Sequence, residues 1–252
     1  MPTFIFGIQL TMLAQKNPNQ ISNWPTKRRK ACFKIANQNI LHMLHDIRTN
    51  YQKFELTGQT VNKDPIQQLT LWLNDAIADQ ILDSTSMVLS TIDQTGNPES
   101  RVVLLKELTP EGLIFFTNYN SKKGTQITAN KNVSVVFFWP QLERQIRIRG
   151  KAKKISKEDS ESYFRSRPLE SQLGAWSSPQ SEIIESRQIL DDNYAHFQKY
   201  FTNHKIKKPP HWGGYLIRPE YFEFWQGRSN RLHDRIEFCR EDQKWMIHRL
   251  AP

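Results

Sequence analysis

The segment from Phe224 to Arg235 carries side chains that could bind a flat anionic ligand. It reads FWQGRSNRLHDR, with one indole, three arginines, a histidine and an aspartate around a single glycine. An indole offers a stacking face, a guanidinium offers a fork of donors for phosphate or carboxylate, and His233 can be held in one orientation between Arg231 and Asp234. The alternative is a charged hairpin end, because charge runs are usually solvated faces.

Two other stretches have residue types suited to a phosphate. Ser121-Lys122-Lys123-Gly124 precedes a short helical stretch through Asn130, so free backbone donors, the helix dipole and two ammonium groups would converge there. Tyr163 and Arg167 lie four residues apart on one face of a predicted helix, with Ser171 just beyond it. For each stretch the alternative is an ordinary solvated turn or helix end.

Short strands are predicted to position these residues. Runs typical of strands occur at 87–92, 101–106, 113–117, 133–139, 145–155, 215–218, 221–225, 235–239 and 245–250. Strict alternation would place Arg101 and Lys106 on opposite faces of one strand, so a bulge, a strand end or a backbone contact must intervene if both serve one site. Successive short strands joined by turns predict an antiparallel barrel or sandwich, a mainly β (α+β) fold.

Three longer helices are predicted among the strands. The first begins at Asp64-Pro65, with aspartate as the cap, and runs to about Leu82. Its apolar face is predicted to comprise Ile66, Leu69, Leu73, Ala76, Ile77 and Ile81. A second begins at Ser156 in a variant capping box and runs to Pro168. A third follows the 177–181 loop and runs to about Tyr200. Its apolar residues are Ile183, Leu190, Tyr194, Phe197 and Phe201.

Composition limits the class of protein. The chain of 252 residues can bury a core, and its net charge of +10 implies anionic partners. It has no run of about eighteen apolar residues, so we expect no membrane span. The two cysteines, Cys32 and Cys239, form no close pair, which predicts a reducing, cytoplasmic location and no metal site.

The start of the chain differs from the rest. We expect residues 1–43 to be a disordered arm and residues 44–252 to form a single domain. Met43 is a hypothetical natural initiator, which N-terminal sequencing of protein made from the native gene would test.

Several segments, in one order from about Leu44 to Pro252, resemble the pyridoxamine (pyridoxine) 5′-phosphate oxidase family. They are RVVLLK at 101–106, FFTN at 115–118, SKK at 121–123, LERQ at 142–145, SRPLESQLGAW at 166–176, QS at 180–181, WGG at 212–214, WQGRSNRLHDR at 225–235 and RLAP at 249–252. The combination is specific, although no single segment is. The resemblance implies an FMN-binding split β-barrel with flanking helices, acting as a homodimer with FMN at the subunit interface.

The resemblance also implies roles for individual residues. Those implied to bind FMN, some from the second subunit, are Arg101, Val102, Val103, Leu104, Leu105, Lys106, Phe116, Thr117, Lys122, Lys123, Gln145, Gln180, Ser181, Trp225 and Arg235. Those implied to bind substrate are Arg48, Tyr51, Lys106, Tyr163, Arg167, Ser171, Arg231 and His233. Arg231 and His233 are the implied catalytic residues. Two positions depart from the family: Lys122 stands where arginine is commoner, and Phe116 where tyrosine is common.

The implied reaction oxidises C4′ of pyridoxine or pyridoxamine 5′-phosphate by hydride transfer to the flavin, with oxygen as the final acceptor and hydrogen peroxide as product. One alternative is another split-barrel FMN protein that reduces a different acceptor. A second is a basic nucleic-acid binder, but the basic residues after Lys30 are interspersed with acidic ones. We therefore expect no nucleic-acid partner.

Overall fold

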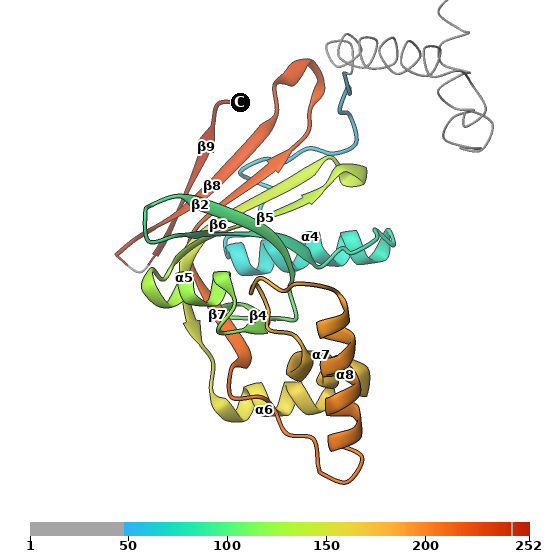
Figure 1. The fold of residues 1–252 in the computed structure, drawn as a ribbon. Coiled ribbons are helices and arrows are strands. Elements are labelled where there is room, and N and C mark those ends of the chain that lie inside the picture. Colours follow the sequence, from blue (N-terminus) through green and yellow to red (C-terminus); the bar gives the residue numbers. More distant parts are fainter. Residues whose placement is uncertain (1–47, 243) are drawn as a thin grey trace, which may run out of the picture. The chain divides into compact units, whose positions relative to one another are not determined.

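The computed structural model describes residues 48–242 and 244–252, in two compact units, Met1–Asn50 and Tyr51–Pro252. The arm predicted for residues 1–43, and the proposed start at Met43, lie outside the described residues. Of the first unit only residues 48–50 are described, and all three are exposed. The second unit holds the sheet and the helices that position the site (Figure 1).

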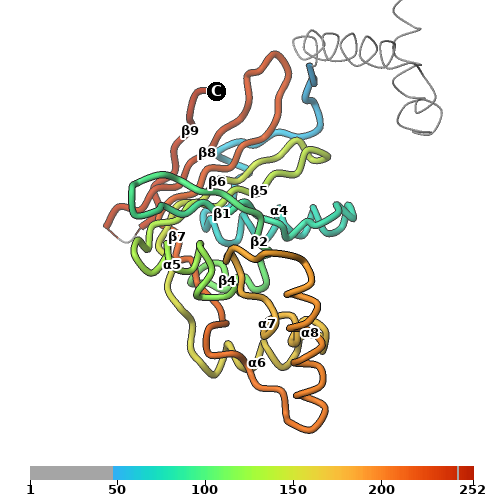
Figure 2. Tube along the Cα trace, viewed as in Figure 1, coloured from blue at the N-terminus to red at the C-terminus, as the bar shows by residue number. Residues whose placement is uncertain are grey.

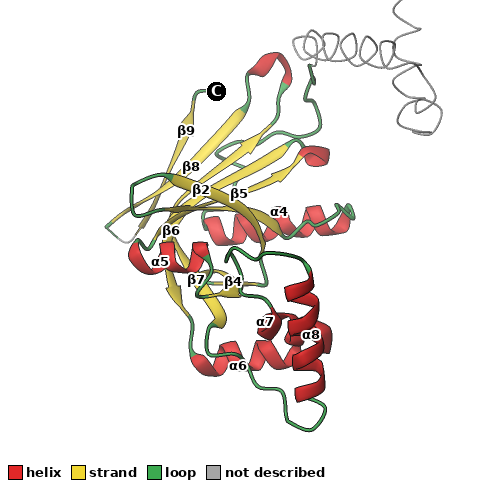
Figure 3. Cartoon of the chain, in the orientation of Figure 1, coloured by secondary structure: helices red, strands yellow, loops and turns green. Residues whose placement is uncertain are grey.

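The second unit is built on one curled antiparallel sheet, which Figure 3 shows in yellow. Its strands are β1 (Ser86–Ile92), β2 (Pro98–Leu104), β3 (Glu107–Thr109), β4 (Gly112–Asn118), β5 (Asn132–Trp139), β6 (Arg144–Lys154), β7 (Trp212–Gln226), β8 (Asp234–Glu241) and β9 (Lys244–Leu250). The order is β2-β1-β5-β6-β7-β4-β3, and β8 pairs with both β7 and β9. The mainly β, split-barrel prediction is confirmed.

The strand β7 joins the two halves of the sheet. It pairs along its length with β6, and on its other side it pairs first with β4 and then with β8. The prediction of two strands, 215–218 and 221–225, was wrong, because a register shift at Arg149/Gly150 leaves Glu220 unpaired and lets the strand continue. A Cβ on Gly150 would lie 2.1 Å from the carbonyl oxygen of Arg218, so only glycine fits at this bulge.

The helix α4 (Pro65–Ala78) begins as predicted, since Asp64 Oδ1 accepts a hydrogen bond from the Ile66 backbone at 2.8 Å. It ends at Ala78 rather than near Leu82. The predicted apolar face was partly wrong: Ile77 is 51% exposed, whereas Trp72 is buried and packs edge-on against Phe224 of the sheet at 5.3 Å.

The remaining helices are α5 (Lys122–Ala129), α6 (Lys157–Ser166), α7 (Leu169–Ser177) and α8 (Gln188–Tyr200). Figure 2 shows α6, α7 and α8 gathered at one end of the sheet. The helix α7 was not predicted, and α8 begins later than expected, which leaves Ile183 fully exposed in the preceding loop. Trp176 of α7 packs against Phe197 of α8 at 5.5 Å, which joins these two helices.

The core lies between the curled sheet and α4. Six strands and α4 supply its fully buried side chains, which include Leu69, Ala76, Leu89, Leu113, Phe115, Val135, Phe137, Ile146, Ile148, Ile217, Phe222, Phe224 and Phe238. In the part of the chain that the structure describes, no helix is long and apolar enough to cross a membrane.

Candidate active site

A cavity of about 490 Å³ lies where the end of β2, the strand β4 and the α6–α7 junction meet. A cleft of this size suits a small organic ligand. The predicted residues that line it are Arg101, Val102, Val103, Leu104, Lys106, Phe116, Thr117, Lys123, Tyr163, Arg167, Ser171 and Gln180. Four of its lining residues are cationic, and none of the described lining residues is acidic. The cavity is therefore suited to an anion with more than one charge.

Arg101 and Lys106 line the same cavity, although strand alternation would separate them. The strand β2 ends at Leu104, and the Lys106 backbone nitrogen donates to the carbonyl oxygen of Ile114 at 2.9 Å. The pleat therefore no longer sets the direction of the Lys106 side chain. The sequence required a bulge, a strand end or a backbone contact if both residues serve one site. The structure has a strand end.

The start of α5 forms one end of the cavity. Lys123 Nζ donates to Thr117 Oγ1 at 3.2 Å and to Gln180 Oε1 at 3.1 Å. Burial first, and then the charge of Arg101, lower the pKa of Lys123 below its ordinary value. Ser121 caps the helix as predicted, and a Cβ on Gly124 would meet the Tyr119 carbonyl oxygen at 2.2 Å. Of the Ser121-Lys122-Lys123 turn, Lys123 lines the cavity, whereas the Ser121 hydroxyl is buried and donates to the Asn118 carbonyl oxygen at 2.6 Å.

Arg101 is held by residues that the sequence reasoning missed. Its Nη1 donates to the Leu89 carbonyl oxygen at 3.4 Å and to Thr91 Oγ1 at 2.5 Å. Its Nη2 donates to Gln126 Oε1 at 3.4 Å and lies 3.4 Å from Glu99 Oε2. Burial lowers the pKa of Arg101, and Glu99 partly offsets the shift. The sequence feature that could have revealed this support for Arg101 was Thr91, a polar residue at an inward-facing position of its strand.

The α6–α7 junction also lines the cavity. Tyr163 lies on α6, Arg167 is the residue that ends α6, and Ser171 lies in the first turn of α7. The guanidinium carbon of Arg167 lies 4.6 Å from the centre of the Trp212 ring, and its Nη1 is buried without a hydrogen-bond partner among the described residues. Burial raises the pKa of Tyr163, which keeps its hydroxyl protonated as a donor. This group therefore offers unused donors to an anion.

Phe116 forms part of an aromatic stack in the wall of the cavity. Its ring lies 3.8 Å from that of Tyr163 and 5.4 Å from that of Trp212, and both pairs are nearly parallel. The phenyl ring here orients Tyr163 through stacking and has no hydroxyl for a ligand. Trp212 belongs to the WGG segment, but the sequence did not mark it as a site residue.

Six residues predicted to bind FMN lie outside the cavity lining, and three of these, Leu105, Lys122 and Ser181, belong to segments next to it in the sequence. Leu105 is buried in the core, and Ser181 is exposed, with a φ of 78°. Lys122 is exposed, and its Nζ forms an ion pair with Glu99 Oε1 at 2.5 Å. The roles of these residues stay predictions.

A second group of predicted residues forms a row across the sheet. Gln145 of β6 is the register partner of Trp225 in β7, which in turn is the partner of Arg235 in β8. Arg235 Nε donates to Glu223 Oε1 at 2.9 Å. Glu223 is buried and also pairs with Arg147. None of these described residues lines the cavity of its own chain.

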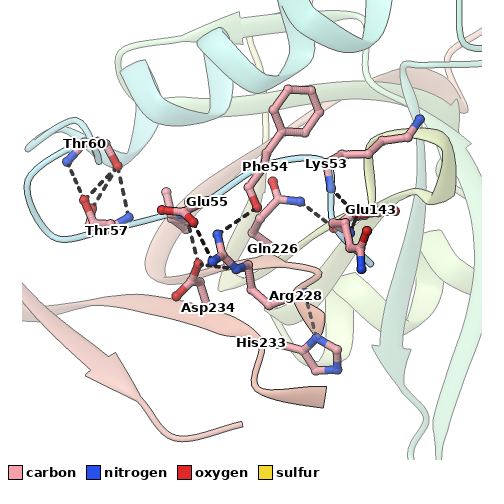
Figure 4. Close-up of polar contacts among 12 residues, drawn as sticks. Lys53, Phe54, Glu55, Thr57, Thr60, Glu143, Gln226, Arg228, His233 and Asp234 are labelled. Atoms are coloured by element: carbon pink, nitrogen blue, oxygen red, sulfur yellow. Dashed lines mark hydrogen bonds and ion pairs between the residues drawn. The ribbon is translucent and has the colours of Figure 1, made fainter. Parts of the chain in front are cut away.

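The loop from Arg228 to Asp234 continues this second group (Figure 4). The His233 ring lies 4.6 Å from that of Trp225 and 5.7 Å from that of Tyr51. His233 Nδ1 accepts from the Arg228 backbone nitrogen at 3.1 Å, so a neutral ring carries its proton on Nε2. Burial and then the charge of Arg231 lower the pKa of His233, which favours this neutral form.

The flanking charges do not orient His233 as the sequence suggested. Asp234 accepts instead from the Leu56 backbone at 3.0 Å and from Arg249 at 2.7 Å. Arg231 is exposed, with a left-handed φ of 62°. Arg48 is exposed and lies in the first unit, so its role stays a prediction.

The segment from Gln52 to Leu56 is tied to the second group by groups that the sequence did not reveal. Glu143 Oε2 accepts from the Gln52 and Lys53 backbone nitrogens at 2.8 and 3.0 Å. Arg228 Nη2 pairs with Glu55 Oε1 at 2.5 Å, as Figure 4 shows. Tyr51, predicted to bind substrate, therefore precedes a segment that is anchored on the Trp225 side of the second unit.

Comparisons with known proteins agree with this arrangement. Residues 73–201 match the family model described as pyridoxamine 5′-phosphate oxidase, and residues 212–252 match that of the pyridoxine 5′-phosphate oxidase C-terminal dimerisation region. A pyridoxine/pyridoxamine 5′-phosphate oxidase of Synechocystis sp. is 47% identical over 83% of this chain and 98% of its own. One of Cytophaga hutchinsonii is 46% identical over 83% of this chain and 98% of its own.

Solved structures show the same fold. PhzG from Burkholderia lata, in complex with tetrahydrophenazine-1-carboxylic acid, matches with a TM-score of 0.75 and 25% identity over 80% of this chain and all of its own. A pyridoxamine 5′-phosphate oxidase-related, FMN-binding protein of Nostoc punctiforme matches with a TM-score of 0.59 and 17% identity, over 77% of this chain and all of its own.

The curled antiparallel sheet and the cavity beside it define a split-barrel protein with a cationic cavity. Within that class, the chain belongs to the pyridoxamine 5′-phosphate oxidase family. Its last 41 residues, 212–252, match the dimerisation region. They include Trp225 and Arg235, two of the three residues in the row across the sheet.

Proposed function

We propose that the protein is an FMN-dependent oxidase that converts pyridoxine 5′-phosphate and pyridoxamine 5′-phosphate into pyridoxal 5′-phosphate, with oxygen as acceptor and hydrogen peroxide as product. The observation that carries this proposal is the cavity, which has four cationic lining residues, no described acidic lining residue and an aromatic wall. Its donors come from two groups, one at the start of α5 and one at the α6–α7 junction, which suits a pair of phosphorylated planar molecules. The names of the relatives support the same activity.

The residues present fit FMN. Arg101 and Lys123, with the start of α5, would hold its terminal phosphate, and Thr117 and Gln180 would bind beside them. Tyr163, Arg167 and Ser171 would hold the substrate phosphate, because Arg167 has a buried donor without a partner. A buried unpaired guanidinium nitrogen costs free energy, and a bound phosphate would remove that cost.

The homodimer would complete the site. The Gln145, Trp225 and Arg235 row does not line the cavity of its own chain, and Trp225 and Arg235 lie in the dimerisation region. We infer that this row, with Arg231 and His233, closes the cavity of the partner chain and places FMN at the interface. The same assignment would bring Arg231 and His233 to the pyridine ring of the substrate.

The chain's own residues bind and orient the reactants in this mechanism. Bound FMN supplies the hydride acceptor. The donors at the α6–α7 junction fix the substrate phosphate, so that C4′ is presented to the flavin in one pose. His233, held neutral with its proton on Nε2, would donate a hydrogen bond at the reacting end, and Arg231 would add a positive charge there. The cytoplasmic location expected from the cysteine usage stays a prediction.

The first test identifies the cofactor and the reaction. Heat-released flavin is identified by chromatography, and bound flavin is mixed with pyridoxine 5′-phosphate without oxygen. We expect FMN and its bleaching by substrate, followed by hydrogen peroxide release when oxygen is added. Recovery of FAD, or no flavin after reconstitution, would contradict the proposal.

A subunit-mixing experiment tests the shared site. Arg167→Ala and Arg231→Ala chains are unfolded, mixed and refolded together. In a mixed dimer one site would carry both substitutions and the other neither, so about a quarter of all sites should regain activity after random pairing. If all the residues act within one chain, mixing restores nothing.

A further inference from the structure

Three metal-ligating side chains converge on the last hairpin, away from the cavity. Glu237 of β8 and His248 of β9 are register partners, and Cys239 lies two residues along β8 from Glu237. Because side chains alternate along a strand, all three lie on one face of the hairpin. Their ligand atoms lie within 4.8 Å of one another.

The distances match the edges of a tetrahedral metal site. His248 Nδ1 lies 3.3 Å from Glu237 Oε1 and 3.7 Å from Cys239 Sγ. Bonds of about 2.0–2.1 Å to nitrogen and oxygen and about 2.3 Å to sulfur give tetrahedral edges of roughly 3.3 and 3.6 Å. Two of the three edges therefore already have the required length, and a cation would need little rearrangement.

The surroundings leave these ligands free for a cation. The neighbouring carboxylate of Glu223 is already paired with Arg147 and Arg235. Among the described residues, Glu237 forms an ion pair with His248 and with no lysine or arginine, and it also forms a hydrogen bond with the Tyr221 side chain. The His248 side chain is 49% exposed, which gives a cation access and leaves room for a water as fourth ligand.

We propose that Glu237, Cys239 and His248 bind one divalent cation of the zinc class per chain and thereby join β8 to β9. Thiolate and imidazole together select a borderline-soft cation such as Zn²⁺ over Mg²⁺ or Ca²⁺. The thiol proton is released on binding, and the thiolate and carboxylate balance the charge of the cation. None of the three residues lines the cavity of its own chain, and their binding of a cation does not depend on the proposed flavin chemistry.

Calorimetric titration of the flavin-loaded, chelator-treated protein with Zn²⁺ tests this proposal. We expect one Zn²⁺ per chain, and a thermal midpoint that rises with Zn²⁺ and falls again with chelator. Cys239→Ser and His248→Gln should each weaken binding at least about tenfold. Cys32→Ser and His204→Gln serve as matched controls and should retain the affinity of the parent.

X-ray absorption at the zinc edge identifies the ligands directly. One sulfur at about 2.3 Å and lighter atoms near 2.0 Å are expected, and the sulfur should vanish in Cys239→Ser. Equal affinity in the parent and both cluster variants would overturn the proposal, as would a zinc spectrum without sulfur. In that case the three residues would be only a hydrogen-bonded surface cluster.

Discussion

Arg167 lies with its guanidinium carbon 4.6 Å from the centre of the Trp212 ring, and its Nη1 is buried without a partner among the described residues. The indole covers one face of the guanidinium, and Arg167 is one of the four cationic residues that line the cavity. Burial lowers the pKa of Arg167, with Tyr163 opposing the shift. An arginine held in this way is prepared for an anion before the anion arrives.

Replacing Arg167 with alanine should weaken substrate binding far more than FMN binding. Charge-assisted hydrogen bonds to a phosphate contribute on the order of 1.5–3 kcal/mol each, so KM should rise about ten- to a hundredfold. Steady-state kinetics and flavin titration provide the two measurements. Arg165→Ala is the matched control, because Arg165 is exposed on the same helix and does not line the cavity. An unchanged KM would remove Arg167 from the site.

Lys122 Nζ forms an ion pair with Glu99 Oε1 at 2.5 Å, so the predicted contact of Lys122 with the flavin phosphate would compete with this pair. Glu99→Gln should free Lys122 and lower the FMN dissociation constant about two- to fivefold. The effect is small because an exposed ion pair contributes little free energy. Lys122 holds the pKa of Glu99 below its ordinary value. The competition is therefore present at neutral pH and is lost as the carboxyl protonates in acid.

Fluorescence titration of the FMN-free protein measures this effect. The difference between parent and variant should shrink as the pH falls below about 4.5, the ordinary pKa of a glutamate. Glu111→Gln is the control, since that carboxylate pairs with Arg218 instead. Equal dissociation constants at neutral pH would show that Lys122 does not reach the phosphate.

Arg231 combines an exposed guanidinium with a left-handed backbone at a φ of 62°. Arg231→Ala should slow anaerobic reduction of the bound flavin by pyridoxine 5′-phosphate, because the proposed contact acts at the reacting end. Arg231→Gly should slow it equally, yet relieve about 1 kcal/mol of backbone strain and raise the unfolding free energy. His233→Ala should act more mildly.

Stopped-flow absorbance measures the rate of flavin reduction. A separate FMN titration checks that all three variants bind the cofactor. Asn230→Gly is the matched backbone control, since Asn230 also has a left-handed φ, of 56°. A normal reduction rate in Arg231→Ala would show that the arginine serves only the loop.

Glu223 is buried and shared between Arg147 and Arg235, which makes it a structural support for the Trp225 row. Burial by itself would raise the pKa of Glu223. The hydrogen bond and the charge of Arg235 outweigh burial, so the pKa of Glu223 is lowered. Glu223→Gln should therefore cost about 1.5–3 kcal/mol of unfolding free energy at pH 7. FMN binding should weaken as well, because Arg235 loses its partner.

The sign of the pH dependence follows from the lowered pKa. The stabilisation by Glu223 is complete above the unfolded-state pKa and is lost as the pH falls through the lower folded-state value. Urea unfolding at pH 7 and near pH 4 should thus show a smaller difference between parent and variant at the lower pH. Glu220→Gln, at an exposed pair with Lys151, is the control. A difference that grows in acid would contradict the assignment.

Local signals in the sequence determined most of the elements and four residues of the cavity lining, Lys123, Tyr163, Arg167 and Ser171, whereas the resemblance implied the other predicted lining residues. The caps at Asp64, Ser121 and Ser156 predicted three helix starts, because a cap is a contact within four residues. Alternation predicted most strands, since one face of each must be buried. The resemblance of the motifs supplied the family, which the comparisons confirm.

Tertiary structure decided the features that depend on distant pairing. The bulge opposite Gly150 makes β7 one continuous strand, where the sequence pattern predicted two. The helix α8 packs against Trp176 and begins only after an exposed loop, where periodicity predicted an earlier start. The strand end at Leu104 brings Arg101 and Lys106 into one cavity, while the sheet register places Trp225 and Arg235 elsewhere. Such choices are made by contacts between residues tens of positions apart, which neither a period nor a motif contains.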